Sequence, residues 1–340
     1  MIKIGKSTLD GKKIYVQTML NAVSSDVSGN IEQAKRAAGA GADIIRVSVP
    51  SLSDVRLITA LKNAVTVPIV ADIHFNADIA VACAEAGADK IRINPGNIGD
   101  EGKVKLVVDA CKKANIPIRI GVNSGSVPKE ILAKFGSPTA EALAVTAMEN
   151  IHALERADFY DIVVSVKSSN VKTMVEANRK LAKLCEYPLH LGVTEAGTRE
   201  TGLIKSAAGI GSLLLDNIGA TIRVSLSDTP EEEVIAGRNI LKALGLAPGV
   251  KVIACPTCGR TRIDVINIAR AIEAKTAGMT KTLTVAVMGC VVNGPGEAKG
   301  ADIAVAGGNH TADLYIKGVK IKTIPEAEIE AALLAEIENM

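Results

Sequence analysis

The phrase Gly41-Ala42-Asp43-Ile44-Ile45-Arg46-Val47 decides the fold, because variants of it return along the chain. It recurs as Gly87-Ala88-Asp89-Lys90-Ile91-Arg92-Ile93 and as Gly219-Ala220-Thr221-Ile222-Arg223-Val224. A second motif is a short, largely apolar run with proline at its second position, and it occupies residues 67–71, 116–120 and 187–191. Each phrase follows an amphipathic stretch rich in Ala, Lys and Glu. Strands that alternate with helices in this way predict βα units and a parallel sheet.

The number of these units predicts a closed barrel. Eight βα units within about 245 residues match the size of a (β/α)8 TIM barrel. The units are even and no glycine-rich dinucleotide fingerprint follows the first strand, which disfavours an open doubly wound sheet. We expect the strands to start near Tyr15, Ile44, Ile69, Lys90, Ile118, Ile162, Leu189 and Thr221.

A second, smaller domain is predicted after the last barrel helix, residues 231–244. The segment 245–249 reads Gly-Leu-Ala-Pro-Gly and breaks this helix, so we place the barrel at 1–247 and the second domain at 248–340. The pattern of this domain is α+β. It comprises strands at 251–254, 283–288 and 302–306, a helix near 262–275, a hairpin turning at 317–318 and a helix from Glu326.

The composition limits the possible functions. Hydrophobic residues make up 48% of the 340 residues and charged residues 22%, which permits a large core. With a net charge of +2, no Trp and 2% aromatic residues, a nucleic-acid-binding surface is not expected. The N-terminus carries no signal-peptide pattern and no apolar run could span a membrane, so we expect a soluble, cytoplasmic protein.

Three of the six cysteines stand where they could hold a metal centre. Cys255 and Cys258 form a C-x-x-C loop, and Cys290 follows an apolar strand in its own Gly/Pro-rich loop. Three thiolates from two loops suit zinc or an iron–sulfur cluster, with Glu297 or His310 as the fourth ligand. The remote third cysteine disfavours a simple redox dithiol. We interpret Cys83, Cys111 and Cys185, in helix-like segments, as small buried hydrophobes.

Polar residues alternate with apolar ones along the barrel strands. The outer face of such a strand packs on helices and must be apolar, so the polar set should point into the barrel. It converges on the C-terminal mouth, where Asp72, His74 and Glu195 end their strands. The four arginines and one lysine of this set outnumber the three residues at the strand ends, so they cannot all be paired within the protein. We therefore expect an anionic substrate with several phosphoryl oxygens. The polar residues that share one face of a strand are Arg46 and Ser48, Arg92 and Asn94, Arg119 and Asn123, Ser165 and Lys167, and Arg223 and Ser225.

These motifs identify a resemblance. Over essentially its whole length the sequence resembles the 4-hydroxy-3-methylbut-2-enyl diphosphate synthase family, of the methylerythritol phosphate route to isoprenoids. It departs at Met19-Leu20-Asn21-Ala22, where the family usually reads Met-Thr-Asn-Thr. The motifs that carry the match are residues 46–50 (RVSVP), 71–74 (ADIH), 92–97 (RINPGN), 119–123 (RIGVN), 194–197 (TEAG) and both cysteine loops.

The resemblance implies a TIM barrel followed by a cluster domain. It implies a [4Fe-4S] cluster on Cys255, Cys258, Cys290 and Glu297. It also implies that 2-C-methyl-D-erythritol 2,4-cyclodiphosphate is reduced to the hydroxymethylbutenyl diphosphate with electrons from ferredoxin or flavodoxin. We expect Glu195 to supply a proton and Glu297 to be a labile ligand. The expected substrate-binding residues are Arg46, Asp72, His74, Arg92, Asn94, Arg119, Asn123, Lys167, Arg223, Ser225 and Asn293.

Two other functions compete with this one. A condensing enzyme like dihydropteroate synthase, with a structural zinc tail, would share the barrel and its arginines. A metal-sensing module would not need the arginines and ranks last.

The topology also suggests an assembly. The eighth helix carries the chain away from the barrel mouth, so we expect a head-to-tail homodimer in which each cluster domain caps the partner's barrel.

Overall fold

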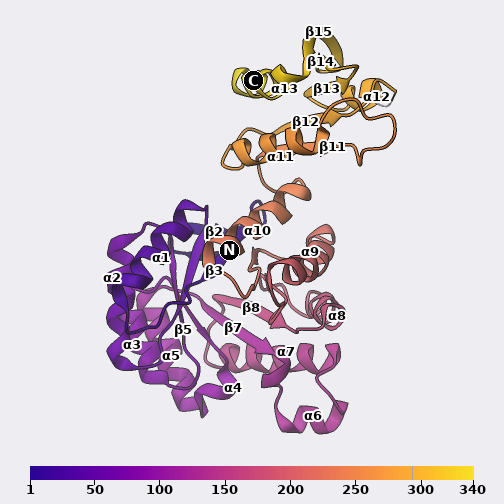
Figure 1. The fold of residues 1–340 in the computed structure, drawn as a ribbon. Helices are drawn as coiled ribbons and strands as arrows, with labels where there is room; N and C mark the ends of the chain where they lie inside the picture. The colour runs from indigo at the N-terminus through magenta and orange to yellow at the C-terminus, as the bar shows by residue number, and fades with distance from the viewer. Residues whose placement is uncertain (293) are drawn as a thin grey trace. The chain divides into compact units, whose positions relative to one another are not determined.

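The structure is a computed structural model that describes residues 1–292 and 294–340. It divides into two compact units, Met1–Leu244 and Gly245–Met340, and each is described by itself (Figure 1). The domain boundary expected after residue 247 falls in the linker at the start of the second unit.

Eight parallel strands form the barrel in the order β8-β7-β6-β5-β4-β3-β10-β9. A parallel bridge between Val164 and Leu189 joins β8 to the residue before β9 and closes the ring. The expected TIM barrel is therefore confirmed, and only the seventh strand starts later than predicted, by one residue. The strands are β3 (Tyr15–Met19), β4 (Ile44–Ser48), β5 (Ile69–Asp72), β6 (Lys90–Ile93), β7 (Ile118–Asn123), β8 (Ile162–Lys167), β9 (His190–Leu191) and β10 (Thr221–Ile222).

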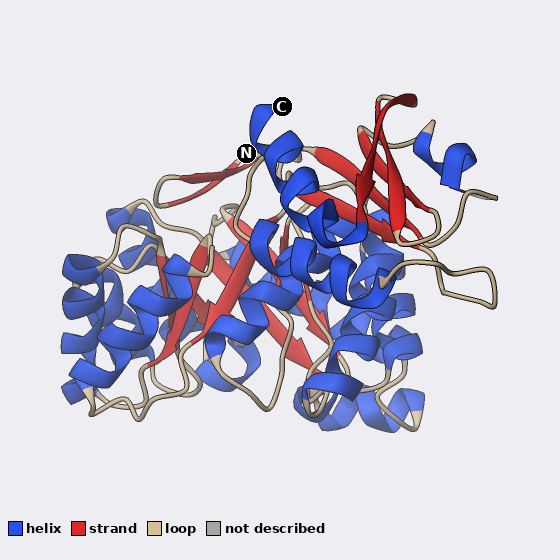
Figure 2. Cartoon of the chain, turned by 45° about the horizontal axis from the view of Figure 1, so that its top comes forward, coloured by secondary structure: helices blue, strands red, loops and turns tan. Residues whose placement is uncertain are grey.

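Helices surround the strands (Figure 2). Their inner faces are apolar at helical spacing, as in α2, where Leu57, Ile58 and Leu61 are buried. Side-chain caps fix several starts; Asp26, for example, accepts a hydrogen bond from Gly29 N at the start of α1. The helices are α1 (Val27–Gly39), α2 (Arg56–Ala64), α3 (Ala77–Glu85), α4 (Pro95–Ile98), α5 (Glu101–Ala114), α6 (Lys129–Phe135), α7 (Ala140–Arg156), α8 (Val171–Leu181), α9 (Arg199–Leu215) and α10 (Pro230–Ala243), with 3-10 turns η1 (Leu52–Val55) and η2 (Ser124–Ser126).

An N-terminal hairpin, not foreseen from the sequence, closes the bottom of the barrel. Strands β1 (Ile2–Ile4) and β2 (Ser7–Leu9) pair in antiparallel fashion. The hairpin buries Ile2, Ile4 and Leu9 in one cluster, whose barrel members include Ile44, Val70, Val163 and Ala220. These barrel residues lie at or near the amino-terminal ends of their strands. The hairpin thus plugs the end of the barrel opposite to the mouth.

The second unit is a five-stranded sheet of order β11-β12-β13-β14-β15. The first three strands are parallel and the last two form the expected hairpin. One face packs on α11 and α13 through residues such as Ile272 and Leu333, and the other holds α12 through Ala298. The elements are β11 (Val250–Ala254), α11 (Val265–Thr276), β12 (Leu283–Met288), α12 (Gly294–Ala298), β13 (Ile303–Gly307), β14 (Thr311–Ile316), β15 (Val319–Pro325), η3 (Glu326–Glu328) and α13 (Ile329–Asn339).

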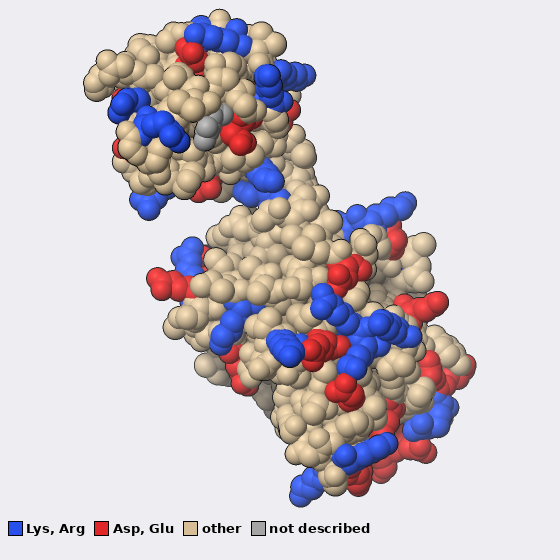
Figure 3. Space-filling model, turned by 90° about the vertical axis from the view of Figure 1, so that its right-hand side faces the viewer, with Lys and Arg blue, Asp and Glu red and all other residues tan. Residues whose placement is uncertain are grey.

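The described surface is mixed in charge. On the face in Figure 3, Lys and Arg side chains are interspersed with Asp and Glu. No helix among the described residues is both long and apolar enough to cross a membrane.

Candidate active site

Asp72 lies at the centre of a network at the C-terminal end of β5. Its Oδ2 accepts a hydrogen bond from Arg46 Nη2 at 2.5 Å, and its Oδ1 accepts one from Arg92 Nη1 at 3.0 Å. His74 Nε2 lies 3.4 Å from Oδ2. Parallel register places these residues together, since Ser48 pairs with Asp72 and Asp72 with Arg92. Four predicted residues, Arg46, Asp72, His74 and Arg92, therefore meet in one network.

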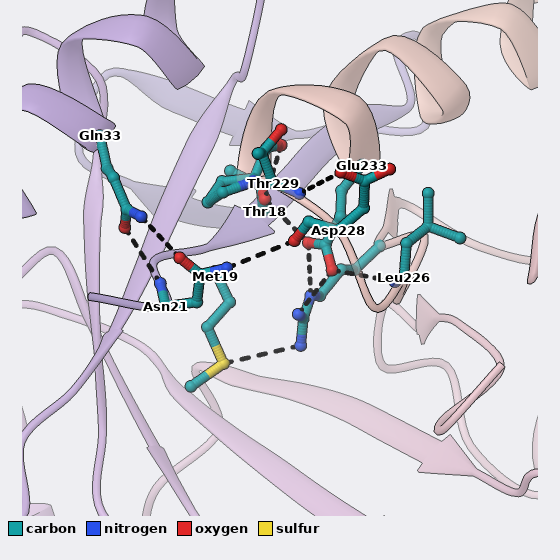
Figure 4. Close-up of polar contacts among 10 residues, drawn as sticks. Thr18, Met19, Asn21, Gln33, Leu226, Asp228, Thr229 and Glu233 are labelled. Atoms are coloured by element: carbon teal, nitrogen blue, oxygen red, sulfur yellow. Dashed lines mark hydrogen bonds and ion pairs between the residues drawn. The ribbon is translucent and has the colours of Figure 1, made fainter. Parts of the chain in front are cut away.

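Arg223 is bound by a carboxylate that the sequence analysis did not single out. Glu233, from α10, accepts hydrogen bonds from Arg223 Nε at 3.0 Å and from Nη2 at 2.8 Å. Its oxygens also accept from Thr18 Oγ1 at 2.8 Å and from Leu226 N at 3.1 Å. Figure 4 shows Glu233 in this setting. Arg223 is thus fixed in position by a carboxylate that is only 3% exposed.

The loop that departs from the family pattern is held by other side chains. Gln33 Nε2 donates to Asn21 Oδ1 at 2.5 Å, and Asn21 Nδ2 donates to the Asp228 carbonyl at 3.3 Å (Figure 4). Leu20 is buried, and its backbone N–H donates to the Arg46 carbonyl at 2.9 Å. The leucine therefore packs into the fold at this position and offers no polar group to a ligand.

Arg119 and Lys167 lie inside the barrel, and glycines leave room for the long side chains of Arg92 and Lys167. A Cβ on Gly121 would lie 2.3 Å from Arg92 Nε, and one on Gly192 would lie 2.9 Å from Lys167 Nζ. A side chain at either glycine would therefore displace a cation. Arg119 is 1% exposed and Lys167 is 6% exposed.

The other predicted barrel residues surround this group less closely. Asn94 is buried and caps α4 by accepting from Gly96 N, while Asn123 and Ser225 are partly exposed. Glu195 is exposed and adopts a left-handed backbone with φ 51°, so the turn after β9 turns its side chain to solvent. Asn293 lies outside the described residues.

The barrel interior carries an excess of positive charge. Among the described residues, Arg46, Lys90, Arg92, Arg119, Lys167 and Arg223 face Asp72 and Glu233. Burial lowers the pKa of Arg46 to about 10, although Asp72 opposes this shift. Burial and Arg223 hold the pKa of Lys167 well below its usual range. Burial raises the pKa of Asp72, but Arg46, His74 and Arg92 outweigh it and keep the pKa well below 3.8.

The two cysteine loops lie at one edge of the second sheet. Cys255 directly follows β11, Cys290 follows the adjacent parallel strand β12, and Gly289 N donates to Cys255 Sγ at 3.2 Å. A Cβ at Gly289 would meet Thr261 and Val265 at under 3 Å, so only glycine allows this approach. Arg262 N donates to the Gly289 carbonyl at 2.8 Å and ties the loops together.

Glu297 follows on α12, whose position is set by small residues. Gly294 lies so close to β13 that a Cβ there would be 2.3 Å from Ala306 Cβ. Ala298 is buried against the sheet, while Glu297 and Cys258 are exposed. His310, the alternative ligand, has an 86% exposed side chain, with Nδ1 3.8 Å from a Glu326 oxygen. Within 1–292 and 294–340, no three His, Cys, Asp or Glu side chains are gathered tightly enough to hold a metal ion.

The remaining cysteines behave as predicted for buried hydrophobes in two of three cases. Cys83 and Cys111 are fully buried, which raises the pKa of each thiol to about 12. Cys185 is partly exposed.

Sequence reasoning missed Glu233, Lys90, Gln17 and His190. Glu233 lies on a helix among other glutamates and gave no signal. Lys90 and Gln17 could have been found, because period-two alternation places Lys90 on the same face as Arg92 and Gln17 on that of Met19.

Similarity to known proteins covers the whole chain. Residues 1–238 match the GcpE TIM-barrel domain and residues 251–339 match the GcpE protein C-terminal domain. A 4-hydroxy-3-methylbut-2-en-1-yl diphosphate synthase (flavodoxin) from Caldanaerobacter subterraneus subsp. tengcongensis is 53% identical, over 100% of this chain and 96% of its own length. The synthase of the same name from Clostridium perfringens is 49% identical, over 100% and 98%.

Two solved structures are similar to about seven tenths of this chain. Dihydropteroate synthase from Stenotrophomonas maltophilia aligns with a TM-score of 0.52 at 16% identity, over 71% of this chain and 96% of that one. A dihydropteroate synthetase with bound product gives 0.52 at 17% identity, over 72% and 99%. At this identity the likeness shows a shared fold and no shared activity. The full-length matches decide the relationship: the chain belongs to the GcpE family, whose relatives at about half identity are 4-hydroxy-3-methylbut-2-en-1-yl diphosphate synthases.

Proposed function

We propose that this chain reduces 2-C-methyl-D-erythritol 2,4-cyclodiphosphate to 4-hydroxy-3-methylbut-2-enyl diphosphate. The cyclic dianion takes up two electrons and one proton and loses water, which leaves an open diphosphate with three negative charges. The observation that carries the proposal is the excess of positive charge in the barrel interior, which holds six basic side chains but only two carboxylates among the described residues. Such a site fits a substrate that is anionic and becomes more so as its ring opens.

The barrel residues would bind the diphosphate and supply the proton. Arg46, Arg92 and Arg223 already have carboxylate partners, so they would present fixed donors. Within the part of the chain that the structure describes, Arg119 and Lys167 form no ion pair with a carboxylate, so they would contribute net charge. The leaving hydroxyl needs a proton to depart as water, and Glu195 is the carboxyl group at the end of its strand. His74, Asn94, Asn123, Ser225 and Asn293 complete the proposed substrate set.

The second unit would carry a [4Fe-4S] cluster on Cys255, Cys258, Cys290 and Glu297. The donor set fits this group, because thiolates are the usual ligands and a backbone N–H already points at the Cys255 sulfur. A bound cluster would deliver electrons singly at low potential. A carboxylate is a weaker ligand than a thiolate for such iron, so Glu297 would be the ligand that yields to substrate.

The electron donor proposed for this chain is flavodoxin. The relatives carry flavodoxin in their names. Ferredoxin is the alternative, and the two donors can be compared directly in one turnover assay.

We further propose a head-to-tail homodimer with a shared active site. The last barrel helix, α10, begins at the mouth and descends, since Arg238 donates to the carbonyl of Gly41, in the turn that precedes β4. The linker 245–249 reaches at most about 17 Å when extended. Helix α10 alone is about 20 Å long, so the linker could not easily retrace it to the mouth. A cluster domain supplied by a second chain would meet the substrate instead.

Anaerobic turnover tests the function. Protein reconstituted with iron and sulfide should be brown, absorb near 400 nm and convert the cyclodiphosphate when reduced flavodoxin is present. The competing barrel chemistry predicts a colourless protein with stoichiometric zinc and no such turnover. That result would refute the proposed function.

A further inference from the structure

The barrel interior below the Asp72 network contains buried polar atoms without protein partners. Gln17, Lys90 and His190 are 0% exposed and Arg119 is 1% exposed. Within the described chain, hydrogen-bond partners are lacking for both amide atoms of Gln17, Lys90 Nζ, Arg119 Nε and Nη1, and His190 Nε2. Leaving even one such group unsatisfied is unfavourable, and here several coincide. We call these four side chains the inner polar layer.

The inner polar layer is enclosed from below and above. Lys90 pairs in register with Val70, which belongs to the apolar floor with Ile44 and the N-terminal hairpin. The ceiling is the Asp72 network, because Arg92 lies two residues further along the strand of Lys90. Branched apolar side chains usually fill this level of a TIM barrel, so a polar layer here calls for an explanation.

Among the described residues, no carboxylate forms an ion pair with a side chain of the inner polar layer. Asp72 is engaged by Arg46 and Arg92, and Glu233 by Arg223. Burial, with the charges of Arg119 and Arg46, lowers the pKa of Lys90. Burial and the cations Arg119, Lys167 and Lys90 lower that of His190. His190 Nδ1 lies 2.7 Å from Thr221 Oγ1, which leaves Nε2 as the free ring nitrogen.

We propose that the inner polar layer binds one small monovalent inorganic anion, of the halide class, beneath the substrate site. Lys90 Nζ, Arg119 and the Gln17 amide nitrogen donate to it, and His190 joins them as its Nε2–H tautomer. Nearly all the unsatisfied atoms are donors, which suits an anion better than a metal ion. One negative charge would offset one of the two positive charges of the Lys90–Arg119 pair and hold Arg119 in place. The site lies beneath that of the organic substrate, and Arg119 would belong to both.

Bromide, used in place of chloride, is the probe for the proposed anion site. The substrate site at the barrel mouth is saturated first, so that bromide cannot bind there. Full-length protein is saturated with the cyclodiphosphate without reductant, a step that rests on the proposed function, and its thermal midpoint is measured in potassium bromide and potassium gluconate. We expect bromide to raise the midpoint, and Lys90→Met to weaken bromide binding by at least about tenfold. Lys113→Met, whose side chain is 81% exposed, is the matched control and should respond like the wild type.

A crystallographic measurement keeps the test independent of how well the variant folds. Wild-type crystals grown in bromide with the cyclodiphosphate should show an anomalous peak within hydrogen-bonding distance of Lys90 Nζ. Water alone at that position, bromide only at the mouth, or an unchanged bromide response in Lys90→Met would each overturn the proposal. A cyclodiphosphate that fails to shift the midpoint in gluconate would count against the proposed function instead, since that step involves no halide.

Discussion

Asp72 is the carboxylate that pairs with the arginines at the barrel mouth. Its carboxylate lies between two arginines and is almost fully buried. Asp72→Asn should destabilise the fold by about 3–5 kcal/mol at neutral pH, because it leaves two buried guanidinium groups without their carboxylate partner. Urea unfolding at pH 7 would measure this, with Asp109→Asn, in an exposed i,i+4 pair, as the control.

The pKa of Asp72 also gives a pH dependence. Because the folded pKa lies below the unfolded value of about 3.9, the stabilisation is complete above that pH and is lost as the pH falls through the folded pKa. Wild-type stability should therefore fall below about pH 4, and the slope should be shallower in Asp72→Asn. Equal slopes in both proteins would show that Asp72 is not the group that titrates.

Arg119 and Arg223 should respond differently to the same substitution. Arg119→Met removes one cation from an excess, so substrate binding should weaken by about 1.5–3 kcal/mol with little loss of stability. Arg223→Met also leaves the buried Glu233 without its ion-pair partner, so unfolding should become easier by about 3–5 kcal/mol. Calorimetric titration and urea unfolding of both variants separate the two effects. Unchanged substrate affinity in both would place the substrate elsewhere.

Glu297 is the proposed carboxylate ligand of the cluster. Glu297→Ala should fold normally, since the side chain is exposed, but should give a labile cluster and little turnover. Iron content and absorbance near 400 nm after desalting would report the lability. Glu328→Ala, an exposed carboxylate of the same unit, is the control. An intact cluster with full activity in Glu297→Ala contradicts the assignment.

At the scale of the element, Gly121 on strand β7 leaves the space that the Arg92 side chain occupies. Gly121→Ala would place a methyl group against the Arg92 guanidinium and turn that side chain away from Asp72. We expect a raised KM for the cyclodiphosphate, by about tenfold if one charged hydrogen bond is lost. Gly211→Ala, on helix α9 with nothing within 4 Å of the added Cβ, is the matched control and should be neutral or slightly stabilising. Equal KM values in the two variants would contradict the role of Gly121.

Most of the barrel could be predicted because its signals are local. Proline or glycine entry marks where six of the eight strands begin, and alternation assigned Arg46, Arg92 and Arg119 to the interior. The N-terminal hairpin was missed because its three-residue strands are too short to show a period. Glu233 was missed for another reason: its partner Arg223 lies ten residues away on a different element, and nothing in the sequence pairs them.

At the scale of the whole molecule, subunit mixing tests the shared site. Glu195→Gln and Cys290→Ala should each be inactive, one in the barrel and one in the cluster domain. In a head-to-tail heterodimer, one of the two sites combines an intact barrel with an intact cluster, so activity should return when dimers are re-formed from the mixture. Mixed dimers that remain inactive would place the complete site within one chain.

The hairpin that seals the barrel bottom has a consequence for how the chain folds during its synthesis on the ribosome. Ile2, Ile4 and Leu9 are synthesised well before Val163 and Ala220, which belong to the same cluster. At about 5–20 residues per second, the last of these partners is made some tens of seconds after the hairpin. During that interval the apolar side chains of the hairpin lack part of the surface that covers them in the folded barrel. The hairpin is therefore made before, but can complete its burial only after, the last strands of the barrel.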